Sequence, residues 1–185
     1  MIATTSYVWA IMLALKTISF IYVAKEDRIA TVVNANTADA CSYWLTRRAT
    51  LALLKRAPEF LTSTSDLAQR APAELRGDVA AFERDAAIAA TAGAMTKTPP
   101  EVLKSSTGSP ELAERLTILP QANQFLFVLA GQSGDGAVGT LTRPELQRVF
   151  QMIQEVVAKA GWMVATAESA AAQRGDATGP KAAPH

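Results

Sequence analysis

Two stretches of the chain repeat the same order of apolar and polar segments. Residues 18–23 and 28–33 are short apolar runs rich in β-branched residues, which is typical of two paired strands. Residues 114–119 and 124–129 show the same pattern. In both stretches a polar, small-residue segment, a third short strand and an amphipathic helix follow. The pattern therefore predicts two strand-strand-strand-helix units.

The two units align at a constant offset without a gap, with residues 18–61 lying over 114–157. This alignment puts the first turns at 24–27 and 120–123. We interpret it as an ancient duplication, although any two strand-to-helix stretches with these periods will align to some degree. Identical positions include Val32, Asp39, Leu45, Thr46 and Arg47, matched by Val128, Asp135, Leu141, Thr142 and Arg143.

The second helix has the clearer start signal. Thr142 and Glu145 have the spacing of a capping box, and Pro144 falls in the first turn, where its missing N–H is not needed. In the first helix, Pro58 predicts a kink or an early end. The expected apolar faces are Leu146, Val149, Phe150, Ile153, Val156 and Val157 in the second unit, and Thr50, Leu53, Leu54, Ala57, Phe60 and Leu61 in the first.

The pattern as a whole predicts an α+β fold. The strands would form one six-stranded sheet or two sheets, and residues 6–15 would add a strand or a helix. An intervening helix with a stripe of Leu75, Val79, Phe82, Ala86 and Ala89 would cover apolar surface left by the two units. The expected divisions are a first unit with an apolar N-terminal segment at 1–65, the intervening helix at 66–93, a flexible linker at 94–110, the second unit at 111–164 and a disordered Ala-rich tail at 165–185.

Composition narrows the classes of function. The chain of 185 residues has 18 Lys and Arg against 17 Asp and Glu, so any binding of nucleic acid would need a local basic patch. Cys41 is the single cysteine and His185 the single histidine, which argues against a catalytic triad and against a metal site built on Cys or His. We expect no cofactor. Lys16, within the apolar stretch 2–23, argues against a membrane span. We therefore expect a cytoplasmic protein.

The most distinctive segment is Trp44-Leu45-Thr46-Arg47-Arg48. Together with the preceding strand pair, it resembles a group of small uncharacterised bacterial proteins in which two strands lead into a Trp-Leu-Thr-Arg-Arg helix start. The resemblance covers residues 18–61, and the second unit lacks the Trp and the second Arg. It implies a strand-to-helix junction and no particular activity.

The same segment is the main candidate binding site. Trp44, Arg47, Arg48, Lys55 and Arg56 would form a basic and aromatic patch for single-stranded nucleic acid or an acidic partner. The alternative is structural: Trp44 packs in or beside the core, and the arginines bond to nearby carbonyl or carboxylate groups.

Three other features have a structural and a functional interpretation. The glycine-rich segment 131–136 is more typical of a hairpin loop than of a phosphate-binding loop. It lacks the Lys-Ser/Thr ending of a Walker A loop and the G-x-G-x-x-G spacing of a dinucleotide-binding loop. Asp39 and Asp135 hold equivalent positions and would form a carboxylate pair only if their loops converged. Cys41 in a strand is expected to be a small buried apolar residue.

Two functions from different classes remain. The absence of a catalytic constellation favours a non-enzymatic interaction or assembly protein that associates with itself or with a protein partner. The other is single-stranded nucleic-acid binding, since tandem strand-rich units with helices are similar in outline to folds of the Whirly type. An enzyme whose site uses backbone amides or a pair of carboxylates is a third hypothesis.

Overall fold

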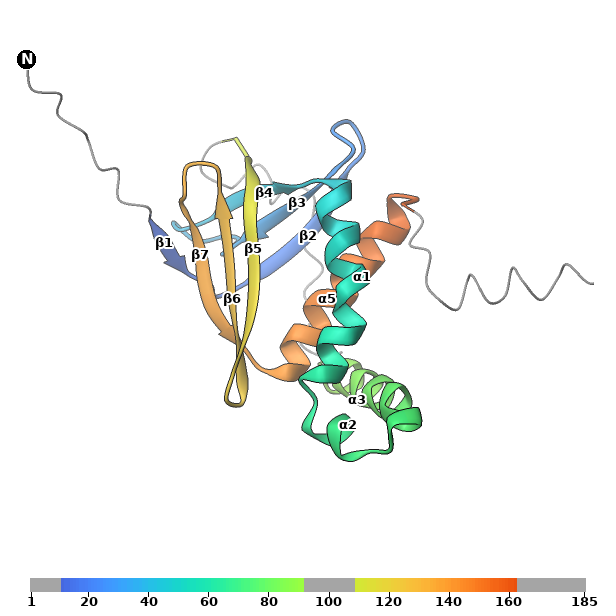
Figure 1. Ribbon diagram of the computed structural model, residues 1–185. Coiled ribbons are helices and arrows are strands. Elements are labelled where there is room, and N and C mark those ends of the chain that lie inside the picture. The colour runs from blue at the N-terminus through green and yellow to red at the C-terminus, as the bar shows by residue number, and fades with distance from the viewer. Residues whose placement is uncertain (1–10, 92–108, 163–185) are drawn as a thin grey trace, which may run out of the picture.

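The α+β fold expected from the sequence is confirmed in a computed structural model, which describes residues 11–91 and 109–162. A single sheet of seven strands has helices packed against it (Figure 1). The predicted linker and C-terminal tail lie largely outside the described residues. The first half contains β1 (Met12–Ala14), β2 (Ile18–Val23), β3 (Arg28–Val33), β4 (Cys41–Leu45), α1 (Arg47–Ser63), α2 (Asp66–Arg70), the 3₁₀ turn η1 (Ala73–Leu75) and α3 (Arg76–Thr91), and the second contains β5 (Glu111–Gln121), β6 (Gln124–Gly131), β7 (Gly136–Leu141) and α5 (Arg143–Lys159).

The order of strands across the sheet is β1-β7-β6-β5-β4-β3-β2. Within each unit the strands are antiparallel, and the two units join through a short parallel pairing of β4 with β5, at Tyr43–Glu111 and Trp44–Leu112. The strand order thus settles the choice left open by the sequence in favour of one sheet. Part of the N-terminal segment adds the short strand β1, parallel to β7.

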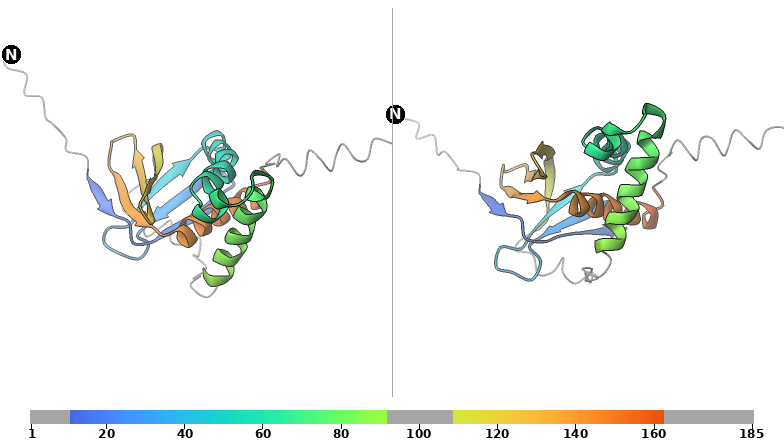
Figure 2. Two further views of the ribbon diagram at one scale, coloured as in Figure 1. Left: turned by 60° about the horizontal axis from the view of Figure 1, so that its bottom comes forward. Right: turned by 90° about the horizontal axis from the view of Figure 1, so that it is seen from below.

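The sheet is rolled, because the chain passes directly from one of its edges to the other. Only residues 15–17 connect β1 at one edge with β2 at the opposite edge. A chain of that length spans at most about 14 Å, so the two edges must lie close together. The two views of Figure 2 show the strands curving around one side of the molecule, with the helices on the other.

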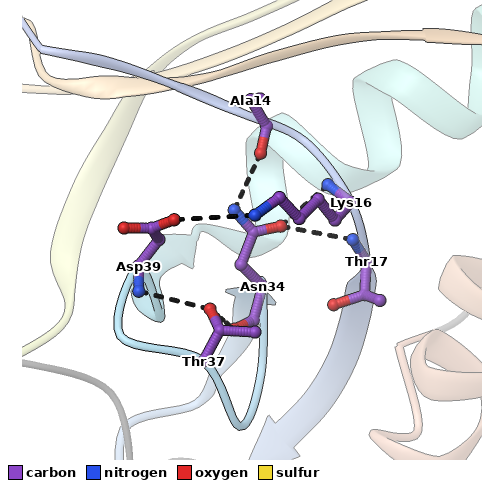
Figure 3. Close-up of polar contacts among 6 residues, drawn as sticks. All are labelled: Ala14, Lys16, Thr17, Asn34, Thr37 and Asp39. Atoms are coloured by element: carbon purple, nitrogen blue, oxygen red, sulfur yellow. Dashed lines mark hydrogen bonds and ion pairs between the residues drawn. The ribbon is translucent and has the colours of Figure 1, made fainter.

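Asn34 holds this connection in place (Figure 3). Its side-chain oxygen accepts hydrogen bonds from the backbone N–H groups of Lys16 and Thr17, at 2.8 and 3.2 Å. Its amide nitrogen donates to the carbonyl of Ala14 at 2.8 Å. Asn34 is fully buried and has a positive φ of 52°, which asparagine tolerates better than most residues. One side chain therefore bonds three backbone groups at and beside the connection between β1 and β2.

From β3 onward, the two units match residue by residue. Ile29 pairs with Leu45 in the first unit, and the aligned Phe125 pairs with Leu141 in the second. Helices α1 and α5 also begin and end at aligned residues, and Thr46 and Thr142 are their N-caps. The predicted capping box of Thr142 and Glu145 is confirmed. The duplication itself stays a prediction.

Two local predictions concern proline: the four-residue turn at 120–123 and the early end of the first helix at Pro58 were wrong, while a kink at Pro58 stays a prediction. The second hairpin turns over Ala122 and Asn123 alone, because β5 continues through Pro120 to pair Gln121 with Gln124. Beside a two-residue turn the Pro120–Phe125 pair is not hydrogen-bonded, so proline's missing N–H costs nothing toward β6. Pro58 does not shorten its helix, since α1 continues to Ser63.

Helix α5 lies at the centre of the hydrophobic core. It contacts strands β2, β6 and β7 as well as helices α1 and α3. All six predicted apolar positions of α5 are buried, whereas Leu53 and Phe60 in α1 are only half-buried. The same pattern of apolar spacing is thus fully covered in one helix and partly covered in the other.

Candidate functional site

The structure separates Trp44 from the basic residues that the sequence grouped with it. Successive side chains of a strand point to opposite faces, and Tyr43 and Leu45 point into the core. Trp44 therefore points to the other face of the sheet, where it is half-buried. Leu45 lines a narrow groove together with Leu53 and Arg56 of α1, which puts α1 on the core side. The sheet lies between Trp44 and α1.

The basic residues themselves are exposed on α1 and do not form one tight cluster. Arg48 and Lys55 are two helical turns apart on the outer face, while Arg56 lies farther round, at the edge of the narrow groove. The four basic residues of α1 offer charge without an aromatic surface on which a base could stack.

Arg47 has a structural partner instead. Its guanidinium lies over the ring of Trp162, 6.0 Å from the ring centroid. The aligned Arg143 lies over Phe125 at 5.4 Å and donates hydrogen bonds to the carbonyls of Leu61 and Thr64 at the end of α1. Each arginine therefore begins one helix and contacts an aromatic ring, and Arg143 also caps the other helix. These contacts support the structural interpretation of the shared Leu-Thr-Arg sequence.

Trp162 also belongs to a polar contact that sequence reasoning missed. Its indole N–H donates to the Asp27 carboxylate at 2.9 Å, and the Tyr22 hydroxyl donates to the same oxygen at 3.0 Å. These hydrogen bonds, Trp162 first and Tyr22 second, hold the pKa of Asp27 below its ordinary value. The bond to Asp27 in turn raises the pKa of Tyr22. Since Trp162 follows α5 and is 3% exposed, this contact anchors the end of the helix to the β2–β3 turn.

The glycine-rich segment is a hairpin loop, as expected, and a carboxylate already occupies it. The N–H of Gly131 donates to the carbonyl of Asp135 at 2.9 Å, and Gly134 has a φ of 89°. Glu111 accepts hydrogen bonds from both the backbone N–H and the hydroxyl of Ser133. An incoming phosphate would compete with Glu111 for these donors, so the loop is a poor anion site.

The two equivalent aspartates have separate partners. Asp39 lies 3.8 Å from the Lys16 ammonium (Figure 3), and Asp135 accepts a hydrogen bond from the N–H of Ile11 at 2.6 Å. In the described part of the chain, no group of three or more His, Cys, Asp or Glu side chains could hold a metal ion. Burial raises the pKa of the Cys41 thiol, which makes it a weak nucleophile.

The clearest candidate site is an apolar groove formed by α2, η1 and α3. Figure 1 shows these elements at one end of the helical side of the molecule. The stripe of α3 was predicted to cover the two units, but it faces outward: Leu75 is 47% and Phe82 is 69% exposed. Leu67 of α2 adds a side chain that is 52% exposed. The residues that line this groove are Leu67, Arg70, Ala71, Leu75, Asp78, Val79 and Phe82.

The opposite side of α3 explains this orientation. Ala87 is buried and Ala80 half-buried, and α3 packs closely on α5. Small residues allow helices to approach closely, and we infer from this burial that this side of α3 faces α5. Glu83 accepts a hydrogen bond at 2.6 Å from the hydroxyl of Ser65, the residue that caps α2. The larger apolar side chains are consequently left on the groove side.

Comparisons with protein-family models, with curated proteins and with solved structures gave no match. Within residues 11–91 and 109–162, none of the helices has both the length and the apolar character needed to cross a membrane.

Proposed function

We propose that this chain is a non-enzymatic protein–protein interaction or assembly protein, and that the groove of α2, η1 and α3 is its docking surface. The observation that carries the proposal is the exposure of Leu67, Leu75 and Phe82, by 52%, 47% and 69%, in one groove. A single exposed apolar side chain is ordinary, but a contiguous set rimmed by charged residues is typical of a binding surface.

The free-energy cost of leaving these apolar side chains in water supports the same proposal. Each large apolar side chain left in water forgoes roughly 1.5–3 kcal/mol of burial energy when it is fully exposed, and these three are about half exposed or more. Two exposed charges, Arg70 and Asp78, flank the groove. The proposal includes a reducing, cytoplasmic location, which the single cysteine supports.

Site-specific photocross-linking in cells tests the docking surface. A photoreactive amino acid is placed at Leu67 in one variant and at Leu119 of β5 in another, since these side chains are 52% and 50% exposed. We expect defined protein adducts from position 67 and none from position 119, and mass spectrometry identifies them. Equal adducts at both positions, or none at either, would refute the proposal.

Single-stranded nucleic-acid binding is the competing result. The α1 residues would then carry it, so Lys55→Glu and Arg56→Glu should abolish salt-sensitive binding of a labelled oligonucleotide while Phe82→Ser leaves it intact. Salt-sensitive binding with that dependence would replace the protein-docking proposal with the alternative.

A further inference from the structure

The same part of the chain forms the groove and carries an apolar helix face of the kind that fills such a groove. A groove between two helices commonly binds the apolar face of a third helix, which presents side chains about every third or fourth residue. Helix α3 carries such a face, with Leu75 just before it and Val79, Phe82, Ala86 and Ala89 along it, and this face is turned outward. The chain therefore offers both the groove and a helix of the kind that fits it.

The charged side chains at the groove of one copy would also be complementary to those of a second copy. Arg70 lies at the end of α2 and Asp78 in the first turn of α3, and both line the groove and are exposed. Neither forms an ion pair with another described residue, whereas the neighbouring Arg84 and Asp85 are 3.3 Å apart. In a two-fold symmetric interface, contact of residue i with residue j implies the reverse contact. One such axis would pair Arg70 with Asp78 twice.

We infer that the occupant of this groove is a second copy of the same chain, and that the two copies pack the outer faces of α3 against each other about a two-fold axis. This inference rests on the proposed function, because it names the partner of the same docking surface. The net charge of +1 adds little long-range repulsion between copies.

The area of the outer face of α3 determines how strong the dimer is expected to be. Helix α3 has 16 residues and is about 24 Å long, and with α2 beside it the face covers on the order of 500 Å². Specific interfaces of standard size bury about 800 Å² on each partner, and weak ones bury less. The dimer should therefore be reversible and dependent on concentration. A strictly permanent dimer would need a larger contact surface than this face.

A charge-exchange experiment tests the inference on the full chain. Sedimentation velocity over a concentration series should give a monomer–dimer equilibrium for the wild type. Arg70→Asp and Asp78→Arg, each alone, should weaken it about tenfold, because like charges then meet across the axis. An equimolar mixture of the two variants should restore association to within about twofold, since each new charge meets its complement.

Matched variants guard against misfolding and non-specific effects. Lys55→Asp reverses an exposed charge outside the groove and should leave the equilibrium unchanged. Phe82→Ser removes the most exposed groove side chain and should leave only monomer, and Leu119→Ser is its control. Far-ultraviolet circular dichroism should be unchanged in all of them. Restoration in the mixture cannot come from two unfolded variants.

The outcomes separate this inference from the proposed function. A wild type that stays monomeric at all concentrations, with adducts to another protein from position 67, would refute the second copy and keep the docking surface. Monomer without any adduct would refute both. Dimers that form equally in the single charge variants and in the wild type would place the contact elsewhere and overturn the inference.

Discussion

The two strand-strand-strand-helix units share a local plan and differ in what surrounds it. Helix α5 buries seven side chains and α1 buries four, although both have 17 residues and begin at aligned positions. The difference comes from their neighbours, because α5 contacts three strands and two helices. Spacing of apolar residues therefore fixes which side of a helix can be buried, and the position of the helix in the fold decides how much of it is.

The largest expected effect tests this difference in burial. Ile153 of α5 is fully buried, and Ile153→Ala should lower the free energy of unfolding by about 2–5 kcal/mol through lost contacts and the cavity left behind. Leu53→Ala in α1 removes a half-buried side chain and should cost less than about half as much. Urea unfolding of both variants measures the costs. Equal losses would show that α1 is packed as tightly as α5.

A second contrast concerns Asn34 and the aligned Ala130. Both are buried, but only Asn34 satisfies the backbone of the β1–β2 connection. Asn34→Ala should cost about 2–4 kcal/mol, because three backbone groups lose their hydrogen-bond partner. The matched control is Asn36→Ala: Asn36 is exposed, has a similar positive φ of 62° and makes none of these three bonds. Chemical denaturation that finds equal costs would assign the effect to backbone strain.

Local signals in the sequence predicted most of the fold. The bounds of β2 and β3 are confirmed, and so is the capping box that starts α5, because turns, caps and apolar periods act within a few residues. The sequence left the single sheet undetermined. That arrangement depends on the pairing of β4 with β5 and on the rolled edges, which join residues far apart in the chain.

The candidate site was predicted less well. Trp44 and Arg47 are close in the sequence, yet the alternation of β4 directs Trp44 to the other face of the sheet. The aromatic partner of Arg47 is Trp162, far along the chain. The α3 stripe was recognised as apolar, but no local signal showed that small residues on another side, such as Ala80 and Ala87, would be covered instead. Whether a stripe packs inward depends on competing faces of the same helix.

A smaller effect should distinguish the starts of the two helices. Thr142 is the cap of a complete capping box, whereas Ala49 stands in the first unit where the second has Glu145. Thr142→Ala should cost about 1 kcal/mol, because the Thr142 hydroxyl accepts from the N–H of Glu145 and also donates to its carboxylate. Thr46→Ala should cost somewhat less, because the Thr46 side chain caps the helix only by accepting from the N–H of Ala49. Ala49→Glu should gain a few tenths of a kcal/mol by completing the box. Thermal unfolding of the three variants measures the differences, and a loss from Ala49→Glu would contradict the proposed equivalence.

The smallest expected effect is a pH dependence confined to the first unit, where Asp27 stands at the position aligned with Asn123. The hydrogen bonds from Trp162 and Tyr22 lower the pKa of Asp27 in the folded protein. Its contribution to stability is therefore present above the pKa of an unfolded aspartate and is lost as the pH falls through the lower, folded pKa.

The proton resonance of the Trp162 indole N–H should follow this titration, with a midpoint below the ordinary aspartate range. Asp27→Asn should abolish the shift, and Asn123→Asp, which adds an exposed carboxylate at the aligned turn, should leave the resonance unchanged. A midpoint at the ordinary aspartate pKa would show that these bonds do not hold in solution.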